Sequence, residues 1–180
     1  AQSLVATNQP DEAADAYDQA RVIFAALKDG DSVDGYVSTG NAGILAHRTG
    51  RISDAATWLS ASIAGQRRLA GDSAAVAAMM GAHGSVLSKL ERHDEAIAHL
   101  REAAELGLRF TGAASPLVMQ NRRLLGDALV GRGDFAEART TFTDTLNDVK
   151  ARVGDGHQFT LWVQLGLARL DAAEGRSRQA

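Results

Sequence analysis

The chain contains no cysteine among its 180 residues. Without thiols it has no disulfide, no thiolate metal site and no cysteine nucleophile. A chain free of cysteine is compatible with a reducing cytosol, although it does not require one. The absence therefore excludes a group of redox and thiol functions and leaves other functions open.

Long apolar runs and a basic charge are also missing. No stretch approaches the roughly 18 apolar residues of a membrane helix, and no charged-then-apolar signal peptide opens the chain. The formal net charge is −3, whereas a nucleic-acid-binding domain is usually clearly basic. We therefore expect neither membrane insertion nor a nucleic-acid partner. We expect a cytoplasmic location, with the periplasmic part of a membrane-anchored regulator left open.

A small residue returns every 41 or 42 positions, as Ala13, Ala55, Ala96, Ala138 and Ala180. An acid or amide precedes each of these alanines. A bulky residue follows four positions after the first four alanines, and a glycine or alanine stands twelve positions before the last four. The bulky residues are Tyr17, Leu59, Leu100 and Phe142, and the small ones are Gly43, Gly84, Gly126 and Ala168. Such a period is typical of stacked repeat proteins, which favours a binding scaffold over an enzyme.

Two further series divide each period into two helices joined by short turns. They are Gly30, Gly71, Gly112 and Gly154, and Asn8, Gly50, Glu91, Gly133 and Gly175. A glycine just past an amphipathic stretch is typical of a helix C-terminus. The predicted helices cover residues 10–28, 32–49, 52–69, 73–90, 93–110, 115–131, 134–152 and 157–173.

Polar residues at several predicted helix starts have the chemistry of N-terminal caps. Ser115 followed by Pro116 predicts a capping serine with proline at the first helical position. Asp134 with Glu137 predicts a reciprocal capping box, and Asp31 with Asp34 resembles one. The acids that precede the repeat alanines fall in the first turn of the second helix, where they would meet free backbone N–H groups.

The repeated residues resemble the tetratricopeptide repeat, most closely over 125–129 and 133–138. The usual period is about 34 residues, and the longer period here resembles the long-helix variant of kinesin light chains. The resemblance covers essentially the whole chain. It implies an all-α fold, a right-handed α-solenoid of antiparallel helix pairs, with residues 1–180 forming a single domain of about four pairs. The pattern departs from the family at Ala42 and His83, where leucine is usual, and at Asp171, where an apolar residue is.

Catalytic and metal-binding motifs do not emerge from the remaining residues. The five histidines lack the i, i+4 spacing of a helical zinc site with an intervening glutamate. The glycine pairs lack the lysine–serine ending of a phosphate loop, and no nucleophile elbow is present. We therefore expect a non-enzyme without a cofactor or metal.

In the tetratricopeptide architecture the first helix of each pair lines a concave groove. The resemblance places these residues in a peptide-binding groove: Asn41, Ile44, His47, Arg48, Ser85, Ser88, Lys89, Gln120, Arg123, Asp127, Trp162 and Arg169. The four cations among them favour an acidic peptide or a free carboxylate, and Trp162 is a candidate apolar anchor. The alternative is that the cations only solvate the inner surface or pair with Asp127.

Two function classes remain open at this point. One is a protein–protein interaction scaffold that binds a peptide or partner segment in the groove. The other is a sensor or oligomerisation module that binds a small effector, or itself, and regulates an attached kinase or transcription-factor domain, as similar arrays do in bacterial multidomain regulators. The chain opens without methionine and inside the repeat pattern. We therefore expect a fragment of a longer chain, or self-association through exposed solenoid ends.

Overall fold

The computed structural model describes residues 15, 19, 22, 31–113 and 115–177. Within these residues it has seven helices of stated bounds and no strand: α3 (Val33–Arg48), α4 (Ile52–Ala70), α5 (Ala74–Lys89), α6 (His93–Thr111), α7 (Pro116–Arg132), α8 (Phe135–Val153) and α9 (Gln158–Ser177). The ends lie within one residue of prediction, except that of α9. The predicted helix 10–28 lies outside the described residues but for three positions.

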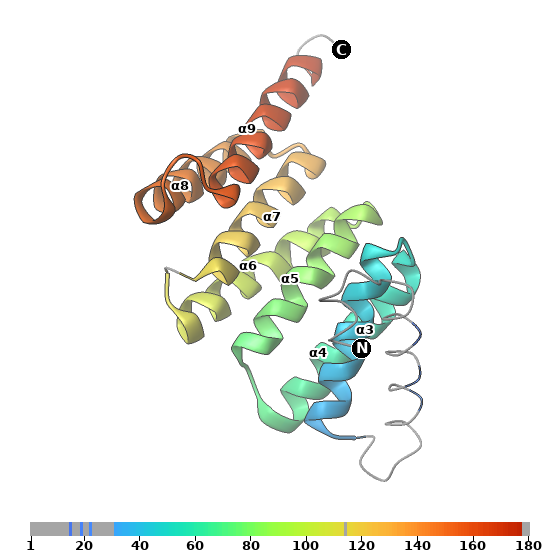
Figure 1. Ribbon diagram of the computed structural model, residues 1–180. Helices are drawn as coiled ribbons and strands as arrows, with labels where there is room; N and C mark the ends of the chain where they lie inside the picture. Colours follow the sequence, from blue (N-terminus) through green and yellow to red (C-terminus); the bar gives the residue numbers. More distant parts are fainter. Residues whose placement is uncertain (1–14, 16–18, 20–21, 23–30, 114, 178–180) are drawn as a thin grey trace.

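The helices form antiparallel pairs that stack in the order of the sequence (Figure 1). Helix α3 packs on α4, α5 on α6 and α7 on α8, and α9 follows as the next inner helix. The backbones of the inner helices α3, α5, α7 and α9 approach one another closely in succession, whereas those of the outer helices α4, α6 and α8 do not. One layer is therefore tighter than the other, which is the arrangement of an α-solenoid and confirms the predicted fold class.

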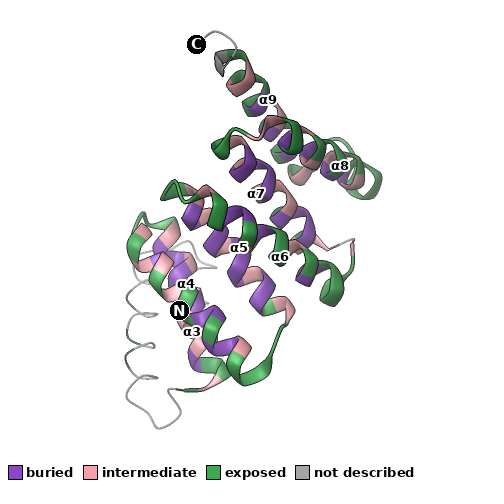
Figure 2. Ribbon diagram, turned by 180° about the vertical axis from the view of Figure 1, so that it is seen from behind, coloured by how far each residue is buried: buried purple, intermediate pink, exposed green. Residues whose placement is uncertain are grey.

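The core lies between the two layers, where Figure 2 shows the buried residues (purple). A glycine on each inner helix faces the bulky residue on its outer partner. A Cβ atom at Gly43 would lie 2.8 Å from Leu59, and one at Gly84 would lie 2.5 Å from Leu100. Leu59 and Leu100 are completely buried. The small–bulky pairing predicted from the repeat is thus a close approach of helix axes.

Glycines end the outer helices as predicted. Gly71, Gly112 and Gly154 follow α4, α6 and α8 with φ of 77°, 77° and 82° and an extended ψ, a region almost restricted to glycine. The turn predicted at Gly175 is wrong, because α9 continues through it to Ser177. Nothing lies within 4 Å of a Cβ atom at Gly175, so no described neighbour forces the helix to stop there.

The capping predictions were only partly correct. Ser115 accepts a hydrogen bond from Leu117 N at 3.2 Å ahead of Pro116, as predicted. The capping box at Asp134 is wrong, because its carboxylate accepts from Arg132 Nε at 2.6 Å and caps no backbone N–H. Ser32, not Asp31, caps α3. An arginine side chain outcompetes the backbone donor for the Asp134 carboxylate because it brings a full charge.

The first-turn acids of the outer helices are also bound by arginines. Asp54 accepts from Arg51 Nε at 2.8 Å, and Glu95 accepts two hydrogen bonds from Arg92, at 2.7 and 2.6 Å. Their predicted position in the first turn is confirmed. Local ion pairs, rather than capping of backbone groups alone, hold these carboxylates in place.

Candidate functional site

A cavity of about 410 Å³ opens on the inner face and is lined by α3, α5 and α7. Half of the residues predicted for the groove line it: Ile44, His47, Arg48, Ser85, Gln120 and Arg123. They meet because inner helices of successive repeats lie side by side and present equivalent positions to the same space. The structure therefore brings together residues that are up to 79 positions apart (44 to 123) in the sequence.

The cavity combines an apolar surface with polar groups that lack a partner. Ile44, Leu117 and Leu124 supply apolar surface from two helices. The Nε2 atom of His47 and the Nε atom of Arg123 are buried and make no hydrogen bond to any described residue. Buried polar atoms without partners are uncommon in folded proteins, and here two of them line one cavity.

Several cationic side chains lie on this face, and they differ in whether they form ion pairs. Arg48 and Lys89 are exposed and make no ion pair with any described residue. Arg123 Nη1 lies 2.5 Å from Asp127 Oδ2, one helical turn away. The pairing with Asp127 that was considered for these cations thus holds for Arg123, whereas Arg48 and Lys89 make no such pair.

Burial alters the titration of two groups on the inner face. Burial raises the pKa of the Asp127 carboxyl, although the charges of Arg123 and Arg169 oppose this rise. Burial also lowers the pKa of His47, and the charge of Lys89 lowers it further. A negative ligand placed near His47 would stabilise the protonated imidazole and reverse this second shift.

The remaining predicted residues do not line this cavity. Asn41 is half-buried on α3, and the Ser88 hydroxyl donates to the carbonyl oxygen of Gly84 at 3.0 Å. On α9, Trp162 is 45% exposed and lies edge-on to Phe159, with ring centroids 5.3 Å apart. Arg169 is exposed on the same helix. The role of these residues in a groove remains a prediction.

Sequence reasoning missed Asn121, which lines the cavity although it is 1% exposed. Its Nδ2 atom donates to the Ala77 carbonyl of the preceding inner helix at 3.5 Å. A Cβ atom at Gly81 would overlap its Oδ1 atom. The glycine that Asn121 faces lies 40 positions earlier in the sequence. Their pairing becomes evident only once the helices are packed, so the sequence contains no usable signal for this residue.

Two other kinds of site were sought in the described part of the chain. No group of three or more histidine, aspartate or glutamate side chains there could hold a metal ion. No described helix has the length and apolar character needed to span a membrane. His83 and His99 do meet, as an edge-on ring pair 4.8 Å apart, without a third candidate ligand grouped with them.

The paired helices and the lined inner face place the protein among the α-solenoids, repeat proteins with extended binding surfaces. Within that class, the tetratricopeptide repeat family model matches residues 75–151, which cover most of α5 to α8. These residues are tetratricopeptide repeats, as the repeated glycines and alanines predicted. Such repeats generally mediate protein–protein interaction and are typically not enzymes.

Two crystal structures of nearly identical TPR-like repeats from a putative kinesin light chain of Podosopora anserina are similar in fold. One of them, a form with a single substitution, aligns with a TM-score of 0.80 over 99% of this chain and 84% of that chain. The other aligns with a TM-score of 0.78 over 99% and 85% of the two chains, and each is 17% identical. This likeness shows the fold. No curated protein matches the chain.

Proposed function

We propose that this protein is an interaction module that binds an acidic peptide segment of a partner protein along its inner face. The observation that carries the proposal is the cavity lined by α3, α5 and α7, with its two unpartnered buried nitrogen atoms. A carboxylate or a peptide carbonyl entering the cavity would satisfy the Arg123 donor. The same ligand would meet the unpaired charges of Arg48 and Lys89.

The charge distribution supports an acidic rather than a neutral ligand. The whole chain is acidic, at −3, yet Arg48 and Lys89 lie on the inner face without an ion-pair partner among the described residues. Arginine suits carboxylates because its planar guanidinium can donate two parallel hydrogen bonds. Exposed contacts of this kind steer and select a ligand more than they add affinity, so binding should weaken with salt.

The test is a fluorescence anisotropy titration of the wild type with labelled acidic and neutral peptide pools of equal length. The double variant Arg48→Ala, Lys89→Ala should lose about five- to tenfold in affinity for the acidic pool, from two partly exposed charge contacts. The loss should shrink at high salt. Arg123 is left intact, because its removal would strand the Asp127 carboxylate and confuse binding with stability.

Arg152→Ala is the matched control, because Arg152 is an exposed cation on the outer helix α8 with no ion pair to a described residue. It should bind the acidic pool as the wild type does. Equal losses in the control and in the double variant, or equal binding of acidic and neutral pools, would rule out the inner-face model.

A further inference from the structure

The gap between the outer helices α4 and α6 is filled by an arginine of the chain itself. Arg67 reaches from α4 across this gap and donates to the carboxylate of Glu102 on α6. Its Nη2 atom also lies 3.3 Å from the sulfur of Met80 on the underlying helix α5. Because the backbones of α4 and α6 do not approach each other closely, this side chain is a bridge between two repeats.

The next gap, between α6 and α8, lacks that arginine. Counted from the repeat alanines Ala55 and Ala96, the position of Arg67 is occupied by Leu108. Counted in the same way, the position of Glu102 is occupied by Asp144. At these equivalent positions the second gap therefore keeps the carboxylate, Asp144, and lacks the arginine. The arginines that enter this gap, Arg101 and Arg122, pair with Glu137 and Asp148 instead.

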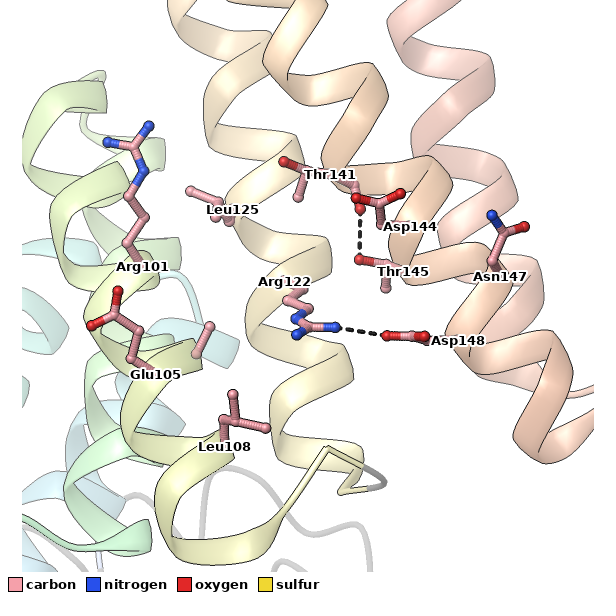
Figure 3. A pocket seen from close by; sticks show the side chains of 11 residues that line it. Arg101, Glu105, Leu108, Arg122, Leu125, Thr141, Asp144, Thr145, Asn147 and Asp148 are labelled. Carbon is pink, nitrogen blue, oxygen red and sulfur yellow. Dashed lines mark hydrogen bonds and ion pairs between the residues drawn. The ribbon is translucent and has the colours of Figure 1, made fainter.

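A cavity of about 620 Å³ lies in this second gap, walled by α6 and α8 and floored by α7 (Figure 3). Both arginines that line it are occupied: Arg122 Nη1 lies 2.8 Å from Asp148 Oδ2, and Arg101 Nη2 lies 2.5 Å from Glu137 Oε1. The cavity shares no lining residue with the cavity on the inner face.

Two carboxylates of the cavity remain without an ion pair to any described residue. They are Glu105 on α6 and Asp144 on α8, and both are exposed on opposite walls. Leu108 and Leu125 provide apolar surface between them, and Leu108 is 44% exposed. Negative charge beside apolar surface matches a side chain with an apolar stem and a cationic head.

We propose that this cavity binds an arginine side chain from a basic segment of a partner protein, in the place that Arg67 occupies one repeat earlier. The guanidinium would pair with Asp144, Glu105 would add negative charge from the opposite wall, and the aliphatic stem would lie on Leu108 and Leu125. The first gap shows the chemistry that fits this type of space in this molecule, because there the arginine is covalently part of the chain. A guanidinium, rather than a compact ammonium, can donate two parallel hydrogen bonds to the Asp144 carboxylate.

The proposal is tested by NMR titration of the ¹⁵N-labelled protein with a blocked pentapeptide of four glycines around one arginine. The arginine peptide should shift the amide signals of Glu105, Leu108 and Asp144 in a saturable way. The same peptide with citrulline, a neutral isostere of arginine, should leave them unchanged. The peptide with lysine should bind more weakly than the arginine peptide, and equal binding would overturn the assignment to a guanidinium.

Two variants connect the signal to the cavity. Asp144→Asn should weaken binding about three- to fivefold, the effect of one partly exposed charge contact. Leu108→Arg restores the internal arginine and should abolish binding, while circular dichroism confirms that it is folded. Glu91→Gln, at an exposed carboxylate in the α5–α6 turn, should bind as the wild type does.

Unchanged binding by Leu108→Arg and Asp144→Asn, or equal shifts with the citrulline peptide, would overturn the proposal. A wild-type dimer that Leu108→Arg dissociates would assign the cavity to a second copy and would equally overturn it. Titration of the same variants with the acidic pool reports on the inner face separately, so the two proposals can fail independently.

Discussion

The ring of Phe142 occupies the space that a side chain at Gly126 would need. A Cβ atom at Gly126 would lie 2.5 Å from Cε1 of Phe142. Phe142 is completely buried, so its ring cannot swing into solvent. The same ring faces Gly166 of α9 at the same distance, and it therefore lies between glycines of two inner helices. This contact binds the third helix pair to the next inner helix.

Gly126→Ala should consequently destabilise the protein although alanine favours helices. The helix gains about 1 kcal/mol from the loss of glycine, whereas forcing a methyl group against a fixed ring costs about 1–3 kcal/mol, as overpacked cores do. We expect a net loss of about 1 kcal/mol in urea unfolding. Gly175→Ala is the control, because nothing lies within 4 Å of its Cβ position and it should be neutral or stabilising. Stabilisation by both substitutions would contradict the close approach.

Glu91 adopts the left-handed conformation, with φ of 60°, in the turn between α5 and α6. Gly50 and Gly133 hold the equivalent turn positions with φ of 82° and 91°. A residue with a Cβ atom pays about 1–2 kcal/mol in this region, partly offset by the larger entropy that glycine loses on folding. Glu91→Gly should therefore raise the free energy of unfolding by about 0.5–1 kcal/mol. Gly133→Ala should lower the free energy of unfolding by about 1 kcal/mol. Urea titrations measure both changes, and a decrease for Glu91→Gly or an increase for Gly133→Ala would refute this interpretation.

His83 should make the fold sensitive to acid. It is 7% exposed, and its ring packs edge-on against His99. Burial, and after it the charges of His99 and Arg92, lowers the pKa of His83 to about 4, while the charge of Glu95 opposes this shift. The unfolded chain, with an ordinary pKa, binds a proton first as the pH falls. The stability that His83 contributes is thus complete above about pH 6.5 and is lost toward pH 4.

From pH 7 to pH 5 this loss should be about 2 kcal/mol in the free energy of unfolding. His83→Leu, which places the usual family residue at this position, should remove most of it. Burial also lowers the pKa of His99 and of His47, so a smaller slope should persist. Urea titrations of both proteins at the two pH values measure the difference. A His83→Leu slope as steep as that of the wild type would contradict the assignment.

Ser73 precedes α5 and Ser88 lies within it, and replacing each with alanine should change the free energy of unfolding differently. Ser73 caps α5, because its Oγ atom accepts from Val76 N at 3.2 Å. Ser88 donates back to the Gly84 carbonyl inside the helix, which already has its own backbone donor. Ser73→Ala should cost about 1 kcal/mol in urea unfolding, while Ser88→Ala should be neutral or slightly stabilising. Equal effects would show that the cap contributes little.

The parts of the fold that could be predicted are those set by residues that recur with the repeat period. The glycines after the outer helices and the bulky residues opposite Gly43, Gly84 and Gly126 recur at 41–42 positions, and the structure confirms them. Helix ends other than that of α9 were accurate because a glycine or a capping serine acts within one turn of its own position. The Asp134 box failed because Arg132, two residues away, competed for its carboxylate.

The candidate site was less predictable. Family offsets placed Ile44, His47 and Arg123 on one face, and the cavity contains them. They left open whether the cations pair with Asp127, which Arg123 does while Arg48 is free of ion pairs to described residues. They also missed Asn121, whose amide reaches back to α5. Whether two charges meet depends on side-chain reach and helix separation, which a linear pattern does not contain.

The amino-acid sequence by itself determined the repeat, its two helices per period and the sites of closest helix approach. Each of these depends on residue size and backbone freedom at fixed intervals, and both are properties of single residues. Only the tertiary structure decided which cations are free, which nitrogen atoms are buried without partners, and that Leu108 leaves a space where Arg67 closed one. Those properties depend on distances between helices that are distant in sequence, and burial and electrostatic pairing arise only once the repeats are stacked.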